Sequence, residues 1–292
     1  MTSVSEHGSR VAALGRVIDL EGTAAIYGPL HDTRQPSDVT IVRDVKYGDN
    51  NRNVLDVFHS SNATPRPVLI FVHGGGFVAG NKSIPNTPFY ENVGIWAARH
   101  GLIGVTITYR LAPDHTWPAG AEDIAKAVDW VRRNIGSFGG DAERVVLFGH
   151  SAGASHVAAY AVMPPLWEQD DLGVAAVILS SGVYDFGSFP TAENIVSYVG
   201  PDASLYVARS SRAGLSQLTV PSMIVHAEFD PPQFVEQAKG LSASMLQAPG
   251  GSPRNVRMQG HNHLSLTYSI GTDDTTFSSE ILRFIEVCTS QA

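Results

Sequence analysis

Short apolar runs rich in β-branched residues alternate with longer amphipathic stretches along most of this chain. From the third run onward they are almost wholly apolar, as expected for strands covered on both faces of a parallel sheet. The first two are joined by residues 48–51, Gly-Asp-Asn-Asn, which favour a hairpin. The chain is therefore predicted to form an α/β fold with one open, mostly parallel eight-stranded sheet and helices on both faces. The predicted strands are 39–45, 54–59, 68–72, 103–109, 144–149, 174–180, 222–227 and 255–258.

Helix-like periodicity fills the gaps between these runs, and no repeat or low-complexity linker divides the chain. We therefore expect a single domain over residues 1–292. Residues 10–30 are predicted to form one amphipathic helix within an N-terminal cap, residues 1–35. Residues 184–218 form a polar, glycine-bearing insertion after the sixth strand, predicted to be a second part of a short cap. The predicted helices of the sheet layers are 119–137, 151–163, 231–246 and 274–287.

Charge and cysteine content exclude several classes of protein. The formal net charge of the 292 residues is −8, so no overall attraction to nucleic acid or to an anionic membrane is expected. No apolar run approaches the ~20 residues that cross a bilayer. Cys288 is the only cysteine, so an internal disulfide cannot form, and no Cys/His spacing indicates a metal site. The polar residues 1–10 do not resemble a secretion signal, and a cytoplasmic location is expected.

The strongest local motif is Gly149-His150-Ser151-Ala152-Gly153, which directly follows the fifth predicted strand and precedes a helix. A serine on such a sharp turn needs small neighbours, because a side chain at either glycine would collide with the adjoining strand or helix. The turn exposes the hydroxyl, and the helix N-terminus favours developing negative charge. The motif predicts that Ser151 is a nucleophile. A chance match in a loop is the alternative, which the strand and helix context disfavours.

Residues 73–77, His-Gly-Gly-Gly-Phe, follow the third strand and are called the glycine loop below. Glycines let a backbone turn its N–H groups toward a substrate oxygen without obstruction by a Cβ atom. Gly75, Gly76 and Ala152 are the predicted donors of an oxyanion hole. His73 is predicted to brace the loop.

Residues 74–79 also fit a dinucleotide-binding pattern, Gly-x-Gly-x-x-Ala. Pro85 and Pro88 would interrupt the helix that this alternative needs. The following strand also lacks a carboxylate for a ribose. A cofactor is therefore not expected.

A serine nucleophile needs a histidine base, and the base needs an acid to orient it. In serine enzymes with an elbow of this kind, both follow the serine in the chain, first the acid and then the histidine. Asp230, just after the seventh strand, is the predicted acid, with Glu228 and then Asp185 as alternatives. The loop after the eighth strand holds two histidines. We favour His263 as the base, and His261 stays open as the alternative.

Several motifs together resemble the hormone-sensitive-lipase-like branch of the α/β-hydrolase esterases, and also the neighbouring feruloyl-esterase-like enzymes and kynurenine formamidases. The resemblance implies the α/β-hydrolase fold, cofactor-free hydrolysis of small esters through an acyl-enzyme, and a homodimer. It also supports Asp230 and His263. His150 departs from the acidic residue usual in the lipase-like branch, and Ala154 replaces a common glycine, which leaves subgroup and substrate open. The motifs are residues 73–77, 80–82, 109–113, 118–119, 122–123, 138–141 and 149–153.

The sequence accordingly predicts a carboxylesterase that acts on a small or aryl ester. Cleavage of an arylformamide or other labile amide by the same residues is an alternative. A binding protein that has lost turnover is a second alternative, which the complete serine–acid–histidine order disfavours. A short cap indicates an accessible pocket for small acyl groups. The predicted pocket wall consists of Phe77, Trp117, Tyr184, Phe229 and Leu264.

Overall fold

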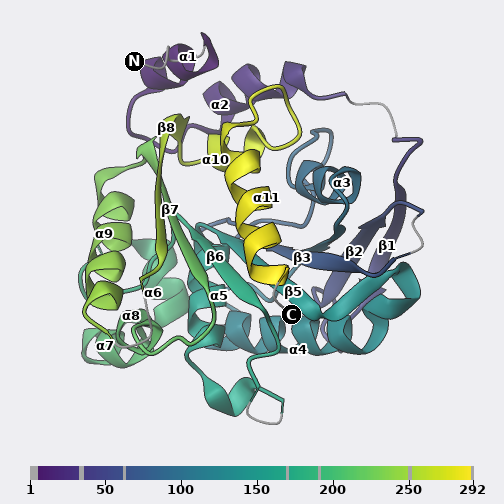
Figure 1. Cartoon of the computed structure of the whole chain (residues 1–292). Coiled ribbons are helices and arrows are strands. Elements are labelled where there is room, and N and C mark those ends of the chain that lie inside the picture. Colours follow the sequence, from purple (N-terminus) through teal and green to yellow (C-terminus); the bar gives the residue numbers. More distant parts are fainter. Residues whose placement is uncertain are drawn as a thin grey trace.

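The computed structural model describes residues 6–32, 36–61, 64–168, 171–189, 192–248 and 252–290. At its centre lies an eight-stranded sheet in the order β1-β2-β4-β3-β5-β6-β7-β8 (Figure 1). The pairs β1–β2 and β2–β4 are antiparallel, and every other neighbouring pair is parallel. The predicted sheet and its N-terminal hairpin are thus confirmed. The strands are β1 Thr40–Lys46, β2 Val54–His59, β3 Arg66–Val72, β4 Ile103–Ile107, β5 Gly140–His150, β6 Ala176–Ser180, β7 Ser222–Phe229 and β8 Arg254–Asn262.

Alternate side chains of the central strands enter two separate cores, one on each face of the sheet. In β3, Val68 and Ile70 join the core beneath α4, α5 and α9. Leu69 and Phe71 join the opposite core, beneath α1, α2, α3 and α11. This two-residue alternation explains why the strands are apolar throughout. The helices of these layers are α1 Glu6–Leu14, α2 Leu20–Tyr27, α3 Glu91–Arg99, α4 Ala119–Asn134, α5 Ala152–Ala161, α9 Pro232–Leu246, α10 Ser265–Tyr268 and α11 Thr276–Thr289.

The N-terminal segment differs from the prediction of one helix over residues 10–30. It forms two helices, α1 and α2, separated by residues 15–19. Gly15 has a φ of +77°, which ends α1, and the Asp19 carboxylate caps α2 by accepting a hydrogen bond from the Gly22 N–H at 2.8 Å. The apolar periodicity of the sequence continues through residues 15–19, so periodicity alone could not predict the break between the two helices.

The insertion after β6 is less polar than the sequence indicated. Among its described residues are the short helices α6 Glu193–Val199, α7 Tyr206–Arg209 and α8 Arg212–Leu215. Ile195 and Tyr198 of α6 are buried in an apolar cluster with Phe77 and Ala152. These last two residues follow β3 and β5, so the insertion covers the carboxyl edge of the sheet.

Strand β8 is longer than predicted and continues into the residues that were expected to form a loop. Its pairing with β7 shifts register between Ala227 and Phe229, and Phe229 then lies opposite Asn262. The strand therefore ends between the two candidate histidines, at Asn262.

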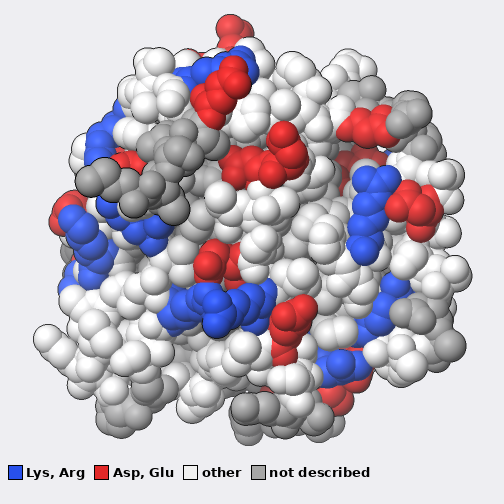
Figure 2. Space-filling view, turned by 45° about the horizontal axis from the view of Figure 1, so that its top comes forward, with Lys and Arg blue, Asp and Glu red and all other residues white. Residues whose placement is uncertain are grey.

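On the face drawn in Figure 2, acidic and basic side chains lie beside one another. Within the described ranges, none of the helices is long and apolar enough to span a membrane.

Candidate active site

Ser151 lies on a tight turn between β5 and α5, with φ +55° and ψ −123°. Such a conformation is strained for a residue with a side chain and needs support from its surroundings. The Ser151 N–H donates to the Ser180 carbonyl at 2.8 Å. A Cβ atom at Gly149 would lie 2.5 Å from the Ala154 Cα, and one at Gly153 would collide with the carbonyl of Val72. The two glycines are thus required for the reason expected from the sequence.

Asp230 and His263 meet at the carboxyl ends of β7 and β8. The His263 Nδ1–H donates to Asp230 Oδ1 at 2.8 Å. Asp230 Oδ2 accepts two more hydrogen bonds, from the Ser181 hydroxyl and the Ala227 N–H, both at 2.7 Å. Burial alone would raise the pKa of Asp230, but His263 and these donors outweigh it and hold the pKa below its usual value. The carboxylate therefore stays ionised beside the imidazole.

The second ring nitrogen of His263, Nε2, is buried and has no hydrogen-bonding partner among the described residues. The Phe234 ring packs against the imidazole, with 4.5 Å between ring centroids. On another side the His150 ring lies 5.0 Å away, and its Nε2–H donates to the His263 carbonyl at 2.8 Å. With Nδ1 donating to Asp230, the imidazole is held in the tautomer whose Nε2 can accept a proton.

The alternative acids and the alternative base occupy other positions. Glu228 pairs with Arg257 at 2.9 Å and accepts the Gly260 N–H at 2.9 Å. Asp185 pairs with Arg212 at 3.3 Å. His261 lies 3.7 Å from Asp274. Of the three candidate carboxylates, Asp230 is the one hydrogen-bonded to a candidate histidine.

The glycine loop lies directly beside the serine turn. A Cβ atom at Gly74 would stand 3.0 Å from Ser151 Cβ. Gly75 and Gly76 have φ values of +136° and +60°, which favour glycine. The N–H groups of these two residues donate to no acceptor in the described part of the chain, and Ala152 is the first residue of α5. The three N–H groups are therefore available for an external oxygen.

Two sets of contacts hold the glycine loop in place. From the cap, the Asn194 side-chain amide of α6 donates to the Gly76 carbonyl at 3.0 Å. From below, the Tyr109 hydroxyl donates to the His73 carbonyl at 2.8 Å, and the two rings stack with centroids 4.4 Å apart. Burial lowers the pKa of His73 to about 3, so its ring is neutral and packs as an aromatic group.

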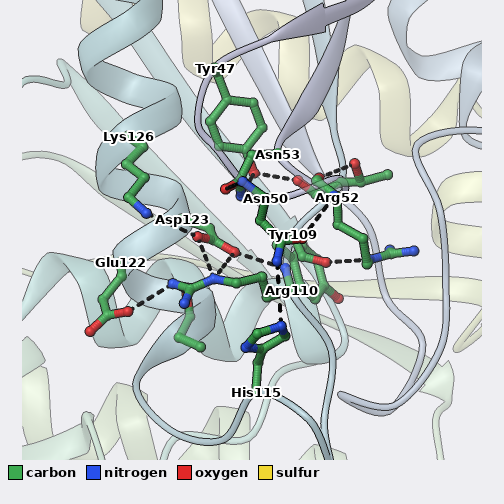
Figure 3. A network of polar contacts seen from close by, with 12 residues as sticks. Tyr47, Asn50, Arg52, Asn53, Tyr109, Arg110, His115, Glu122, Asp123 and Lys126 are labelled. Atoms are coloured by element: carbon green, nitrogen blue, oxygen red, sulfur yellow. Dashed lines mark hydrogen bonds and ion pairs between the residues drawn. The ribbon is translucent and has the colours of Figure 1, made fainter.

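Figure 3 shows how Tyr109 is held in turn. The Arg52 guanidinium donates to the Tyr109 carbonyl at 2.6 Å. The next residue, Arg110, forms an ion pair with the fully buried Asp123 at 2.9 Å and with Glu122 at 2.7 Å. Tyr109 thus links the glycine loop to Arg52, and Arg110 links the same segment to α4.

The structure does not bring the five predicted pocket residues together. Phe77 and Trp117 belong to the apolar cluster beside Ser151. Tyr184 is fully buried in the core beneath α5, while Leu264 and Phe229 pack into the core on the other face of the sheet. The five side chains thus belong to three separate clusters, so their packing does not support the prediction that they form one wall.

Sequence reasoning missed three residues at the site: Ser181, Asn194 and Phe234. Phe234 lies in the first turn of α9, and nothing in the local sequence marks it as a neighbour of His263. Ser181 directly follows β6 with a φ of +50°, and nothing in the local sequence marks it. In the part of the chain that the structure describes, cavities of about 250 to 740 Å³ lie elsewhere and are lined by residues other than Ser151 and His263.

Comparison with known proteins agrees with this geometry. The chain is 35% identical to esterase LipQ of Mycobacterium tuberculosis over 75% of this chain and 56% of that protein. It is 30% identical to the probable carboxylic ester hydrolase LipM of the same organism, over 77% of this chain and 56% of that protein. The chain thus spans about half the length of these curated relatives.

Among solved structures, an inhibited esterase B from Lactobacillus rhamnosis superposes with a TM-score of 0.75 at 20% identity, covering 98% of this chain and 97% of that one. Residues 69–265 match a family described as alpha/beta hydrolase fold, and this segment contains the serine turn and both members of the Asp230–His263 pair. The chain belongs to the alpha/beta hydrolase fold family.

Proposed function

We propose that this protein hydrolyses small carboxylic esters through an acyl-enzyme on Ser151. The supporting observation is the 2.8 Å hydrogen bond between Asp230 and His263, whose second ring nitrogen is left without a partner among the described residues. The strained Ser151 turn lies at the same edge of the sheet. The names of the relatives, which are esterases, support the same reaction class.

In the first half of the reaction, Ser151 Oγ attacks the ester carbonyl carbon and His263 Nε2 takes the hydroxyl proton. Asp230 stays ionised and stabilises the imidazolium. The carbonyl oxygen becomes an oxyanion, to which the N–H groups of Gly75, Gly76 and Ala152 donate. The bond from carbon to the alcohol oxygen then breaks, and His263 returns the proton to the departing alkoxide.

In the second half, a water molecule attacks the acyl carbon while His263 Nε2 accepts one of its protons. The tetrahedral intermediate forms again and expels Ser151 Oγ, which regains the proton from His263. The products are the carboxylic acid and the free serine hydroxyl. The nucleophile, the base and the oxyanion donors all come from the chain, so these steps need no metal and no cofactor.

The apolar cluster beside Ser151 favours small acyl groups. Phe77 stacks on Tyr198 of α6 with centroids 4.7 Å apart, and Phe234 packs on His263. The phenylalanine and tyrosine rings belong to the same cluster as Ala152, the residue that follows the nucleophile. We therefore expect hydrolysis of acetyl and butyryl esters and poor hydrolysis of emulsified triolein.

The test is hydrolysis of p-nitrophenyl acetate and butyrate by the wild type and by Ser151→Ala, with an arylformamide assayed in parallel. Ester turnover that is lost in Ser151→Ala supports the proposal. Turnover of the arylformamide alone would replace it with amide hydrolysis. A folded wild type that binds esters without cleaving them would contradict it. A homodimer and a cytoplasmic location stay predictions, which light scattering and cell fractionation test.

A further inference from the structure

A second histidine–carboxylate pair lies behind the catalytic turn. The His261 cluster consists of Thr23 and Tyr27 of α2, the turn residues His261, Asn262 and Ser265, and the residues Asp274 and Thr276 before and at the start of α11. All except Thr276 are at most 9% exposed. Within the described part of the chain, no hydrogen bond joins this cluster to Asp230 or Ser151, so the reaction as proposed above does not use it.

One half of the cluster fixes the His261 ring. The Thr276 hydroxyl donates to Asp274 Oδ1 at 2.7 Å and lies 2.8 Å from His261 Nε2. The single proton of the Thr276 hydroxyl is donated to Asp274. The hydroxyl oxygen therefore acts as the acceptor for the His261 Nε2–H. The Tyr27 hydroxyl donates to the other oxygen of Asp274 at 3.0 Å. His261 Nδ1, 3.1 Å from Ser265 Oγ, is then the acceptor side of a neutral ring.

The other half fixes the backbone on both sides of His263. The Asn262 N–H donates to Ser265 Oγ, and the Ser265 N–H donates to Asn262 Oδ1, both at 2.9 Å. This reciprocal pair closes the turn as a capping box closes a helix N-terminus. The Asn262 amide then donates to Thr23 Oγ1 at 2.9 Å, which ties the turn to α2.

We propose that the His261 cluster is a positioning device: His261 and the α2 residues Thr23 and Tyr27 hold the turn that aims His263 at Asp230 and Ser151. The inference rests on the proposed function, because it assigns His263 as the base. His263 follows directly after the residues that the cluster anchors, and its Nδ1 must stay within hydrogen-bonding distance of Asp230. A displacement of about 1 Å at such a group costs on the order of 100-fold in rate.

The variants remove one contact at a time. Thr23→Val is nearly isosteric and removes the acceptor for Asn262, and Thr23→Ser restores a hydroxyl. Tyr27→Phe removes the donor to Asp274. The matched control is Tyr160→Phe, because the Tyr160 hydroxyl is also buried and donates to a single oxygen, the Leu172 carbonyl, at 2.6 Å. Tyr160 lies near the end of α5, away from the turn.

We expect Thr23→Val and Tyr27→Phe to lower kcat roughly 10-fold or more with KM nearly unchanged, as loss of a group that supports a reacting residue does. Thr23→Ser should recover most of the activity. Tyr160→Phe should lose comparable thermal stability at full kcat. In proton NMR spectra of protein with isotope-labelled histidine, the strongly deshielded signal of the His263–Asp230 hydrogen bond should broaden in Thr23→Val and Tyr27→Phe. It should stay sharp in Tyr160→Phe.

Two outcomes would overturn the positioning role. One is a loss of stability in the α2 variants without a change in kcat beyond that of Tyr160→Phe. The other is an unchanged proton signal. Failure of the proposed function is a separate result: a wild type that neither cleaves p-nitrophenyl butyrate nor reacts at Ser151 with diethyl p-nitrophenyl phosphate.

Discussion

His261 and His263 stand two residues apart, are equally buried, and each lies near a carboxylate, yet their environments differ. His263 donates to Asp230 at 2.8 Å and keeps one ring nitrogen without a partner in the described structure. His261 has both ring nitrogens engaged, by Ser265 and Thr276, and lies 3.7 Å from Asp274. A base needs a ring nitrogen that is free to accept a proton, which His263 has and His261 lacks. The pattern of hydrogen bonds therefore separates the two roles where proximity to an acid does not.

Removing each imidazole ring in turn is the most direct test of which histidine is the base. We expect His263→Ala to lower kcat for p-nitrophenyl butyrate roughly 10⁴- to 10⁶-fold, as loss of a triad base does. His261→Ala should lower kcat only about 10- to 100-fold, through misplacement of the turn. A larger loss in His261→Ala than in His263→Ala would reverse the assignment. Circular dichroism of both variants checks that they fold.

The two carboxylates extend the comparison. Asp230→Asn should lower kcat about 10⁴-fold, because an amide cannot orient His263 in the required tautomer. Asp274→Asn should lower kcat only about 10-fold, through the same turn as Tyr27→Phe. We also expect it to reduce the free energy of unfolding by about 1–3 kcal/mol, because its contacts to Tyr27 and Thr276 are disrupted. Urea denaturation and steady-state kinetics on both variants measure the two effects. Equal losses of kcat would show that the two pairs act as one unit.

The pH dependence of the free energy of unfolding tests whether His261 is neutral in the folded protein. Burial lowers the pKa of His261 below its ordinary 6.5, although Asp274 opposes the shift. The unfolded chain then binds a proton that the folded chain does not, so stability falls as the pH drops below about 6.5. His261→Gln should reduce the slope of unfolding free energy against pH between about 6.5 and 5. His73, His150 and His156, whose pKa values burial lowers to about 3, leave part of the slope in place. An unaltered slope would contradict a neutral His261.

The smallest effect is expected at the alternative acid. Glu228 is engaged with Arg257 and the Gly260 N–H and does not contact His263. Glu228→Gln should change kcat less than about 3-fold and the free energy of unfolding by less than about 1 kcal/mol, because its ion pair is partly exposed. Steady-state kinetics on p-nitrophenyl acetate measure the change in kcat. A large loss of kcat in Glu228→Gln would make Glu228 a candidate for the acid in place of Asp230.

The sequence predicted the sheet well because the central strands are apolar on both faces, and that signal is local. It favoured His263 but left His261 open, because the choice depends on where β8 ends. The end at Asn262 follows from a register shift opposite Ala227 and Phe229, more than 30 residues earlier in the chain. Tyr184 was misplaced for a similar reason, since nothing local shows which face of the sheet an aromatic side chain enters.

The hydrogen bond between Thr23 and Asn262 joins residues that are 239 positions apart in the chain, and the one between Tyr27 and Asp274 joins residues 247 positions apart. During translation, α2 is therefore made long before either of its partners exists. Because a chain is made from its N-terminus, the proposed nucleophile Ser151 is synthesised before the proposed base His263, and the cluster proposed to position His263 is complete only once Asp274 has been made.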